Sequence, residues 1–293
     1  MLALGLGCVC LLNPHRPLLY LIDIFTLPGL TGTFVLAALL WAVRQAPAKW
    51  IATAAFAVFV IAIWPQAFPR QAAADTSRPS VKLVFANMLI RNRHPEKILL
   101  WIARENPDVV AMVEVSPFAR DTMMATLKHD RPYVVTRYDM VVASRYPLAN
   151  VERGGVGFAL LTATVKAPGG DLTLAVAHLT RPWPFSDPAD QPRQFARLSA
   201  ALAPMSDRHF VLVGDFNTPP CASGLGDFLR GRHLHAAGAF NGTWISVLPG
   251  LLRVTIDNAM ASGDLNLSHR HAGPYDGSDH RPIVVDIRPA KAP

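Results

Sequence analysis

Two short polar segments in the C-terminal third of the chain have residue types that could act on a phosphate group. Residues 214–217 read Gly-Asp-Phe-Asn and directly follow an apolar run, and residues 278–280 read Ser-Asp-His shortly before another. Each segment places a carboxylate and a second polar group where a buried strand would emerge, which is where metal-assisted chemistry on a phosphate would need them. This pairing predicts a hydrolase.

Further polar residues fall where other strands would end. Asn87 follows the first apolar run of the domain, Glu114 ends the second, His178 ends a hairpin strand, and Asp257 lies in a later strand-like segment. Taken one at a time, such residues have structural explanations, because Asn stabilises turns through its own backbone and Asp279 could cap a turn or helix. Their joint recurrence at strand ends within one domain favours a shared site.

Alternating strand-like and helix-like segments would position these residues. Apolar runs and alternation predict strands over residues 81–86, 108–115, 158–165, 171–177, 210–214, 254–261 and 283–287. Helices are expected over residues 95–105, 117–129 and 191–205. Many strands with interspersed helices and a hairpin indicate sheet layers that are covered by helices.

The apolar residues of the chain concentrate at its front. The 293-residue chain is 51% hydrophobic with a mean hydropathy of +0.24, and residues 29–43 and 50–64 carry no charge. A helix needs about 20 apolar residues to cross a bilayer, with about 17 as the low end, so both runs are short but plausible spans. Buried core helices are the alternative. Residues 1–12 are apolar as well and add a possible partial span.

This pattern divides the chain into four parts. Residues 1–68 are expected to be membrane-anchoring helices, 69–80 an Ala/Pro-rich linker, 81–289 a catalytic domain and 290–293 a tail. Arg44 and Lys49 lie between the two expected spans, so the positive-inside rule places their loop in the cytoplasm and the catalytic domain on the outer face. Three cysteines, two of them in the apolar front, provide no disulfide framework for the soluble part.

The charge balance suits an anionic substrate. The chain has 28 Lys and Arg and 21 Asp and Glu, a net charge of +7; residues 1–78 hold five of the basic and two of the acidic residues, which leaves 23 less 19, or +4, for the remainder. A long nucleic acid would be expected to require a denser basic face.

An ordered series of motifs resembles one known family. The series comprises Asn87, Glu114 within Val-Glu-Val, Ser-Arg-Tyr-Pro-Leu at 144–148, His178-Leu179, Gly-Asp-Phe-Asn at 214–217, Ile256-Asp257 and Gly-Ser-Asp-His-Arg-Pro at 277–282. It is similar to the endonuclease/exonuclease/phosphatase superfamily, and the apolar front resembles that of its membrane-anchored bacterial members, the type called YafD-like. The resemblance implies an α+β fold, a four-layer α/β/β/α sandwich of two packed mixed sheets flanked by helices, preceded by a hydrophobic helical membrane segment. It also implies a multi-pass protein of the inner or cytoplasmic membrane of a bacterium.

The resemblance further implies a divalent metal, Mg²⁺ or Mn²⁺, because hard oxygen ligands and phosphate suit these ions. Glu114 corresponds to the principal metal ligand of the family. Asn87 corresponds to a residue that helps to position the metal and the phosphate, and Asp279 to an additional carboxylate on the metal side.

The catalytic roles that the resemblance implies fall on five residues. Asp215 would orient or deprotonate the attacking water, and Asn217 would donate a hydrogen bond to the developing negative charge. His280 would contact the scissile phosphate while Asp257 fixes its tautomer. His178 matches a second phosphate-contacting position.

Trp244 resembles an aromatic residue of a family loop that can line the substrate pocket together with His178 and Asn217. An equally good interpretation is a tryptophan that packs its loop onto the sheet.

Three functional hypotheses follow. The favoured one is a membrane-tethered, metal-dependent phosphodiesterase that is nuclease-like and acts on nucleic acid or a nucleotide-containing molecule. A phosphatase or phospholipase-like hydrolase of lipid or inositol phosphates is the alternative, which the anchor makes attractive, and a tethered binding protein with a retired site is the third. The partners expected are therefore a phosphate-ester substrate and a membrane, and the sequence indicates no protein partner.

Overall fold

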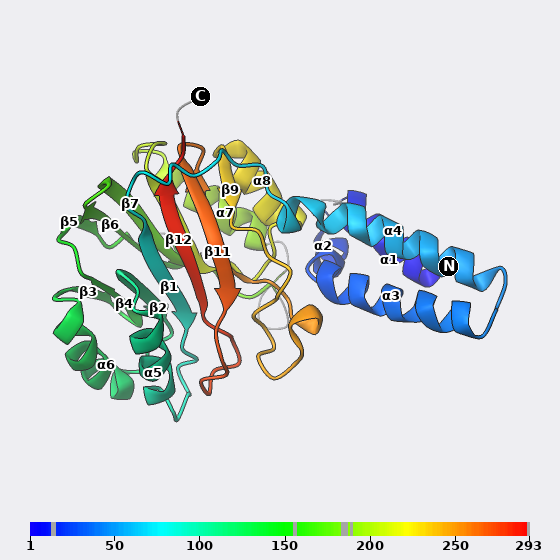
Figure 1. The fold of residues 1–293 in the computed structure, drawn as a ribbon, viewed down its shortest axis with the longest axis horizontal. Helices are drawn as coiled ribbons and strands as arrows, with labels where there is room; N and C mark the ends of the chain where they lie inside the picture. Colours follow the sequence, from blue (N-terminus) through cyan, green and yellow to red (C-terminus); the bar gives the residue numbers. More distant parts are fainter. Residues whose placement is uncertain (13–15, 155–156, 183–186, 188–189, 292–293) are drawn as a thin grey trace.

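Two six-stranded sheets pack face to face at the centre of the domain that follows residue 80 (Figure 1). The computed structural model describes residues 1–12, 16–154, 157–182, 187 and 190–291. In the first sheet the strand order is β11 (Leu265–Ala272), β12 (Ile283–Pro289), β1 (Val81–Asn87), β2 (Val109–Val113), β4 (Met140–Ser144) and β3 (Tyr133–Arg137). In the second it is β5 (Leu148–Glu152), β6 (Ala159–Ala167), β7 (Gly170–His178), β8 (Phe210–Asp215), β10 (Asp257–Ser262) and β9 (Leu234–Ala236).

Helices cover the outer face of each sheet. Helices α5 (Glu96–Glu105) and α6 (Pro117–Asp130) pack on the first sheet, and α7 (Asp190–Leu202) and α8 (Ser223–Gly231) pack on the second. A third apolar cluster of buried side chains fills the space between the sheets. The predicted α+β fold, a four-layer α/β/β/α sandwich of two mixed sheets, is confirmed.

The sequence patterns locate the central strands well and the peripheral ones poorly. Strands β1, β2, β6, β7, β8 and β12 lie within two residues of the predicted bounds at both ends, whereas β3, β4, β5, β9 and β11 are not predicted. The strand expected to begin at residue 254 begins at Asp257 instead. The reason is local, because Val254 pairs with Trp244 in an isolated bridge rather than with the sheet.

Within the described part of residues 1–80, four helices precede the sandwich: α1 (Leu2–Leu12), α2 (Pro17–Asp23), α3 (Thr26–Ala42) and α4 (Ala48–Ala67). Helices α3 and α4 form a hairpin that projects away from the sandwich, and α1 packs on α4 (Figure 1). The runs 29–43 and 50–64 fall almost entirely within α3 and α4. Among the described residues, α4 is the helix that is both long and apolar enough to cross a membrane, with a mean hydropathy of 1.7, while α1 and α3 are shorter apolar helices.

Helix α2 contacts the second sheet layer through buried polar groups. The carboxylate of Asp23 accepts hydrogen bonds from the backbone N–H of Ser223, at 3.0 Å, and from its hydroxyl, at 3.1 Å, at the start of α8. The hydroxyl of Tyr20 donates to Thr218 Oγ1 at 3.0 Å. An acceptor at the first turn of a helix satisfies N–H groups that have no partner within that helix. Asp23 therefore caps a helix that lies 200 residues away in the sequence.

The end of α4 contributes a second buried contact. Gln66 Nε2 donates to the carbonyl of Ala239 at 3.3 Å and to Thr255 Oγ1 at 3.2 Å, and the N–H of Ala239 donates back to the carbonyl of Gln66 at 3.0 Å. The thiol of Cys221 donates to Gln66 Oε1. These contacts, together with those of α2, define the junction between the N-terminal helices and the sandwich.

The segment over residues 69–80 connects the two parts and is held along the first sheet. Gln71 exchanges hydrogen bonds with the backbone of Leu267, and the N–H of Asp75 donates to the carbonyl of Pro289 at 2.9 Å. Ala74 forms a bridge with Ala290. The expected tail, residues 290–293, thus begins as an edge partner of this segment; residues 292–293 lie outside the described part of the chain.

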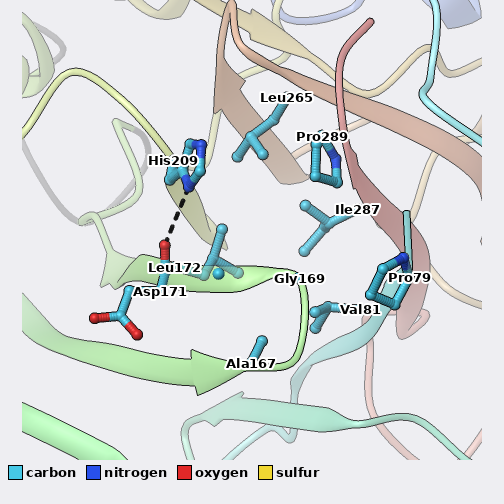
Figure 2. Close-up of a pocket in the computed structure, with 11 residues that line it drawn as sticks. Pro79, Val81, Ala167, Gly169, Asp171, Leu172, His209, Leu265, Ile287 and Pro289 are labelled. Carbon is cyan, nitrogen blue, oxygen red and sulfur yellow. Dashed lines mark hydrogen bonds between the residues drawn. The ribbon is translucent and has the colours of Figure 1, made fainter. Parts of the chain in front are cut away.

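At the end of the sandwich where β1 begins, a hollow of about 20 Å³ lies between the sheets (Figure 2). Val81, Leu172 and Ile287 give it an apolar floor, and His209 lies at its rim. A space of this size holds about one water molecule. The sites able to accept a substrate therefore lie elsewhere.

Candidate active site

Strand register brings three of the predicted site residues into one row of the second sheet. Strand β7 pairs in parallel with β8 so that His178 lies opposite Asp215, and β8 pairs antiparallel with β10 so that Asp257 lies opposite Asp215. The preceding Gly214 allows this close pairing, because a Cβ there would lie 2.0 Å from the carbonyl oxygen of Ala177. Gly214 is therefore required by the packing of β7 against β8, and Asp215 supplies the carboxylate of the site.

The first sheet provides a matching pair of residues across the sandwich. Asn87 is the last residue of β1, and Glu114 directly follows β2 with a positive backbone φ of 54°. Asn87 Nδ2 donates to Glu114 Oε1 at 2.9 Å and to Asp215 Oδ2 at 3.0 Å. This amide therefore links the strand ends of the two sheets. A left-handed glutamate is uncommon, and such strain occurs at functional sites more often than elsewhere.

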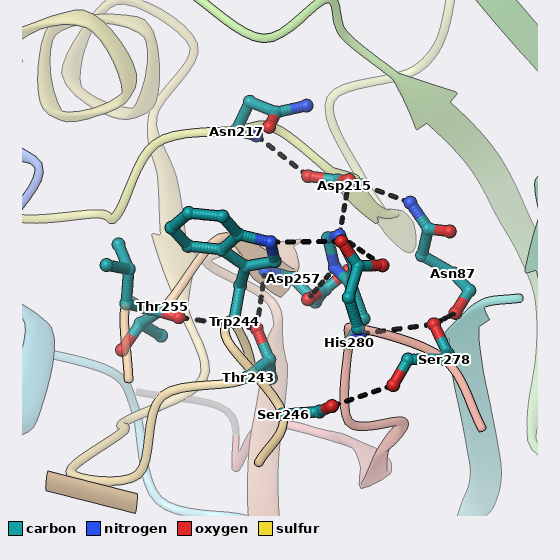
Figure 3. A network of polar contacts seen from close by, with 12 residues as sticks. Asn87, Asp215, Asn217, Thr243, Trp244, Ser246, Thr255, Asp257, Ser278 and His280 are labelled. Carbon is teal, nitrogen blue, oxygen red and sulfur yellow. Dashed lines mark hydrogen bonds and ion pairs between the residues drawn. The ribbon is translucent and has the colours of Figure 1, made fainter. Parts of the chain in front are cut away.

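His280 and Asp257 form a buried hydrogen-bonded pair (Figure 3). The imidazole Nδ1 lies 2.9 Å from Asp257 Oδ2, and Nε2 lies 3.7 Å from Asp215 Oδ2. Burial lowers the pKa of His280, but the carboxylates of Asp257 and Asp215 outweigh burial and raise the pKa to about 10. His280 is therefore an imidazolium at neutral pH, with Nδ1–H donating to Asp257 and Nε2–H directed toward Asp215.

Asp215 is almost fully enclosed, with 1% of its surface exposed. Burial raises the pKa of its carboxyl to about 6, and the neighbouring charge of His280 opposes that rise. A carboxylate whose pKa lies near 6 is a stronger base than an ordinary aspartate and is still ionised at neutral pH. These properties suit a proton acceptor.

His178 lies at the edge of a cavity of about 390 Å³. Its Nε2 lies 3.6 Å from Glu114 Oε1 and 3.8 Å from Asp215 Oδ2, so the ring faces both carboxylates. Phe158 and Arg181 line the same cavity. Neither residue was expected at the site from the sequence. The available signal is the position of Arg181, three residues after His178, in the segment that follows strand β7.

Asn217 shares the turn that follows Asp215. Its backbone N–H donates to Asp215 Oδ1 at 2.9 Å, and its Nδ2 donates to the carbonyl of Leu179 at 2.8 Å. Because an amide nitrogen carries two hydrogens, one remains for another acceptor. Asn217, like Glu114, has a positive backbone φ, here 50°.

Asp279 and Trp244 form a second group beside His280. Trp244 Nε1 donates to Asp279 Oδ2 at 3.2 Å, and Asp279 Oδ1 lies 3.9 Å from His280 Nε2. The guanidinium of Arg181 lies 5.8 Å from the centre of the Trp244 ring. The structure thus groups Asp279 with Trp244 and His280, rather than with Glu114 and Asn87.

Ser278 ties the loop of His280 to the first sheet. Its hydroxyl donates to the carbonyl of Asn87 at 2.8 Å and accepts from the N–H of His280 at 3.1 Å, while its own N–H donates to Asp276 Oδ1 at 3.1 Å. The Ser-Asp-His segment therefore contains one residue that fixes the loop and two that point into the site.

Two groups of side chains offer ligand atoms for a divalent cation. Asp215, Asp257 and His280 bring potential ligand atoms within 4.8 Å of one another, but the Nδ1 atom of His280 is already hydrogen-bonded to Asp257. This trio is therefore better described as a hydrogen-bonded His280–Asp257 pair beside Asp215. The Glu114 carboxylate, with 23% of its side chain exposed at the cavity, offers the hard oxygens that Mg²⁺ prefers. Asn87 presents its amide nitrogen to Glu114, and its oxygen accepts from the N–H of Leu89. The residues fit a cation on Glu114, with Asn87 orienting that carboxylate.

The sequence of the chain matches the model of the Endonuclease/Exonuclease/phosphatase family over residues 84–280. No curated protein matches it.

Solved structures share the fold. An endonuclease/exonuclease/phosphatase from Beutenbergia cavernae has a TM-score of 0.57 at 20% identity, over 74% of this chain and 73% of that one. Sphingomyelinase C from Streptomyces griseocarneus has a TM-score of 0.52 at 17% identity, over 71% of this chain and 99% of that one. A mutant beta toxin from Staphylococcus aureus with bound magnesium ions has a TM-score of 0.55 at 16% identity, over 73% and 100%. At such identities the likeness shows the fold.

Proposed function

The chain belongs to the endonuclease/exonuclease/phosphatase family, and from this premise we propose that it is a membrane-tethered, divalent-metal-dependent phosphodiesterase. The single observation that carries the proposal is the meeting of strand ends from both sheets. There the amide of Asn87 bridges Glu114 and Asp215, with the His280 imidazolium beside them. A site with carboxylates on one side and a fixed cation on the other suits hydrolysis of a phosphate ester.

The proposed steps assign one task to each side chain. Asp215, a base with a raised pKa, accepts a proton from the attacking water. General-base catalysis of this kind contributes roughly 10²- to 10⁴-fold to the rate. The Nε2–H of His280 stabilises the non-bridging oxygens, and Asp257 holds the imidazolium by its Nδ1–H. Asn217 donates its remaining amide hydrogen, and His178 contacts the phosphate from the cavity side.

Glu114 is the proposed metal ligand. Asn87 orients it. Asp279, which lies beside Trp244 and His280, is proposed as an additional carboxylate on the metal side. A bound Mg²⁺ or Mn²⁺ would neutralise charge on the phosphate and stabilise the leaving oxygen. The magnesium ions of the beta toxin structure support the choice of Mg²⁺.

The tethering element of the proposal is the N-terminal helical hairpin. Helix α4 has the length and hydropathy of a span, and α3 is proposed as its partner in a multi-pass anchor of the YafD-like type in a bacterial inner membrane. Arg44 and Lys49 lie at the far end of the hairpin, so positive charge at that end favours a cytoplasmic loop and a sandwich on the outer, periplasmic face.

Two substrate classes remain for this site. A nucleic-acid phosphodiester is the first, since the chain beyond residue 78 carries a net charge of +4 and Arg181 lines the cavity. A phospholipid head group is the second. It is favoured by the position of Trp244, whose loop contacts α3 at one end and Asp279 at the other.

The proposal is tested on the full chain in detergent. Wild-type protein is expected to release nitrophenol from a nitrophenyl phosphodiester with Mg²⁺ and to release none in EDTA; equal rates in both would contradict it, and no release in either would favour a binding protein. Plasmid nicking and release of head groups from mixed micelles, run in parallel, separate the two substrate classes.

A further inference from the structure

The connection between β9 and β10 has an unusually apolar exposed surface. Residues 240–252, here called the interfacial loop, contain no charged residue. Of the twelve large hydrophobic side chains that are exposed among the described residues from 81 to 291, six belong to this loop: Phe240, Ile245, Val247, Leu248, Leu251 and Leu252. A contiguous exposed apolar patch marks an interaction surface more often than chance exposure does.

The loop lies beside both long N-terminal helices. Its short helix η1 (Gly250–Leu252) packs on α3, and the carbonyl of Leu251 accepts from Thr31 Oγ1 at 2.8 Å. Thr31 is five residues past the start of α3, about 7.5 Å along the helix at 1.5 Å per residue. The tip of the loop therefore overlaps the first turns of α3, as Figure 1 shows near the base of the hairpin.

The opposite side of the loop contacts the end of α4 through aromatic rings. Phe240 and Phe68 meet edge to face with centroids 5.4 Å apart, and Phe68 lies 4.6 Å from Trp64 in the last turns of α4. All three rings are partly exposed. Aromatic rings at the ends of spanning helices are typical of the membrane–water interface.

The junction between the N-terminal helices and the sandwich holds the loop beside the first turns of α3 and the last turns of α4. Asp23, Tyr20 and Gln66 bind the sandwich through buried hydrogen bonds, so the depth of the loop follows the depth of the hairpin.

The root of the loop is bound to the site. Trp244 donates to the Asp279 carboxylate, and the N–H of Ser246 donates to the Asp279 carbonyl at 2.8 Å. The N–H of Arg281 donates to the carbonyl of Thr243 at 3.0 Å. Contacts thus pass directly from the apolar loop to the segment that carries His280.

We propose that the interfacial loop inserts its apolar side chains into the lipid interface of the bilayer that holds α3 and α4, and so fixes the Trp244–Asp279 side of the site at a set distance from that bilayer. The inference rests on the membrane tethering in the proposed function. Lipid is the occupant because the patch is uncharged and continuous with the exposed apolar surfaces of the two helices.

The test measures the depth of the loop without requiring activity. Cys8 is replaced by alanine, and single cysteines are placed at three similarly exposed positions by Val247→Cys in the loop, Leu39→Cys in α3 and Leu100→Cys in α5; Cys10 and Cys221 are buried. Each full-length variant is labelled with an environment-sensitive fluorophore and reconstituted in phosphatidylcholine/phosphatidylglycerol vesicles. Quenching by head-group-level nitroxide lipids is compared with quenching by aqueous iodide.

The label at Val247 is expected to be quenched by the lipid nitroxide several-fold more than the label at Leu100, and to be shielded from iodide as the label at Leu39 is. If Val247 responds to iodide as Leu100 does while Leu39 is quenched by lipid, the interfacial loop does not enter the bilayer although the tether does. If Leu39 also responds only to iodide, the tethering itself is wrong and the inference fails with it.

Discussion

Two buried aspartates, at different places in the molecule, show what separates a chemical site from a structural one. Asp23 at the junction points its carboxylate at the start of α8 and accepts from the N–H and hydroxyl of Ser223. Asp215 at the strand ends is equally buried, but its neighbours are two histidines and a second acid. Asp23 serves the start of a helix. Asp215 also accepts hydrogen bonds, from Asn87 Nδ2 and the N–H of Asn217, but its burial and the neighbouring Asp257 still raise the pKa of its carboxyl.

This difference predicts opposite responses to mutation. A carboxylate that accepts hydrogen bonds at the start of a helix stabilises the fold. A carboxylate that the fold makes costly to ionise destabilises the protein, and its retention is explained by chemistry.

Asp215→Asn removes the proposed base without changing the size of the side chain. We expect kcat to fall by roughly 10²- to 10⁴-fold, the usual contribution of a general base, with little loss of folded protein. The measurement is hydrolysis of a nitrophenyl phosphodiester by full-length protein. Asp171→Asn, at the exposed start of strand β7, is the matched control and should keep wild-type kcat. Wild-type activity in Asp215→Asn would contradict the assignment.

Asp23→Ala should show the reverse pattern. It leaves the N–H of Ser223 buried without its acceptor, which costs about 1–3 kcal/mol in the free energy of unfolding, and kcat should change far less than in Asp215→Asn. Thermal unfolding in detergent measures the loss.

Asp23→Asn retains an oxygen acceptor and should recover most of that stability. If Asp23→Ala instead lowered kcat as strongly as Asp215→Asn and left the unfolding temperature unchanged, the junction would belong to the chemistry and the contrast would be wrong.

Without metal, Asp215→Asn is expected to stabilise the protein above pH 6. The folded pKa of Asp215, about 6, exceeds the value near 4 of an unfolded aspartate, so the folded state binds more protons between these pH values. Stability therefore falls as pH rises from about 4 to 6 and stays reduced above that.

The two-unit difference sets an upper limit of about 3 kcal/mol, and we expect roughly 1–3 kcal/mol of gain for Asp215→Asn at pH 8 in EDTA and almost none at pH 4. Denaturant unfolding at the two pH values provides the measurement. A variant less stable than wild type at pH 8 would show that the folded site favours the carboxylate.

Trp244→Phe should have the smallest effect. It keeps the apolar ring but removes one hydrogen bond to Asp279, worth about 0.5–1.5 kcal/mol. We expect KM to rise by roughly two- to tenfold with kcat near wild type. Steady-state kinetics measure KM and kcat separately. A two- to tenfold fall in kcat with KM unchanged would instead show that Trp244 acts in the transition state.

The sequence predicted the central strands because their signal is local. Residues 109–113 and 210–213 are continuous apolar runs, and buried strands in the middle of a sheet consist of such runs. Strand β5 is half exposed and β9 is three residues long, so neither produces a readable pattern. Helix α8 contains three glycines and is capped by Asp23 from a distant part of the chain, and no local rule detects such a cap.

The site residues could be named from the sequence, but their partners could not. Motif order indicated Asn87, Glu114, Asp215 and His280, and the structure brings them within contact of one another. The grouping of Asp279 with Trp244, and the approach of Arg181 to that ring, depend on how loops fold over the strand ends. Loop conformation is set by tertiary contacts that residue spacing does not reveal.

The most direct test of the account is a Mg²⁺ titration of hydrolysis by wild-type protein, Glu114→Gln and Glu105→Gln, the last changing a glutamate at the end of α5. The account predicts that wild type and Glu105→Gln are activated over the same Mg²⁺ range and are silent in EDTA, while Glu114→Gln requires far more Mg²⁺ or remains inactive. Activation of Glu114→Gln at wild-type Mg²⁺ concentrations, or hydrolysis that persists in EDTA, would contradict it.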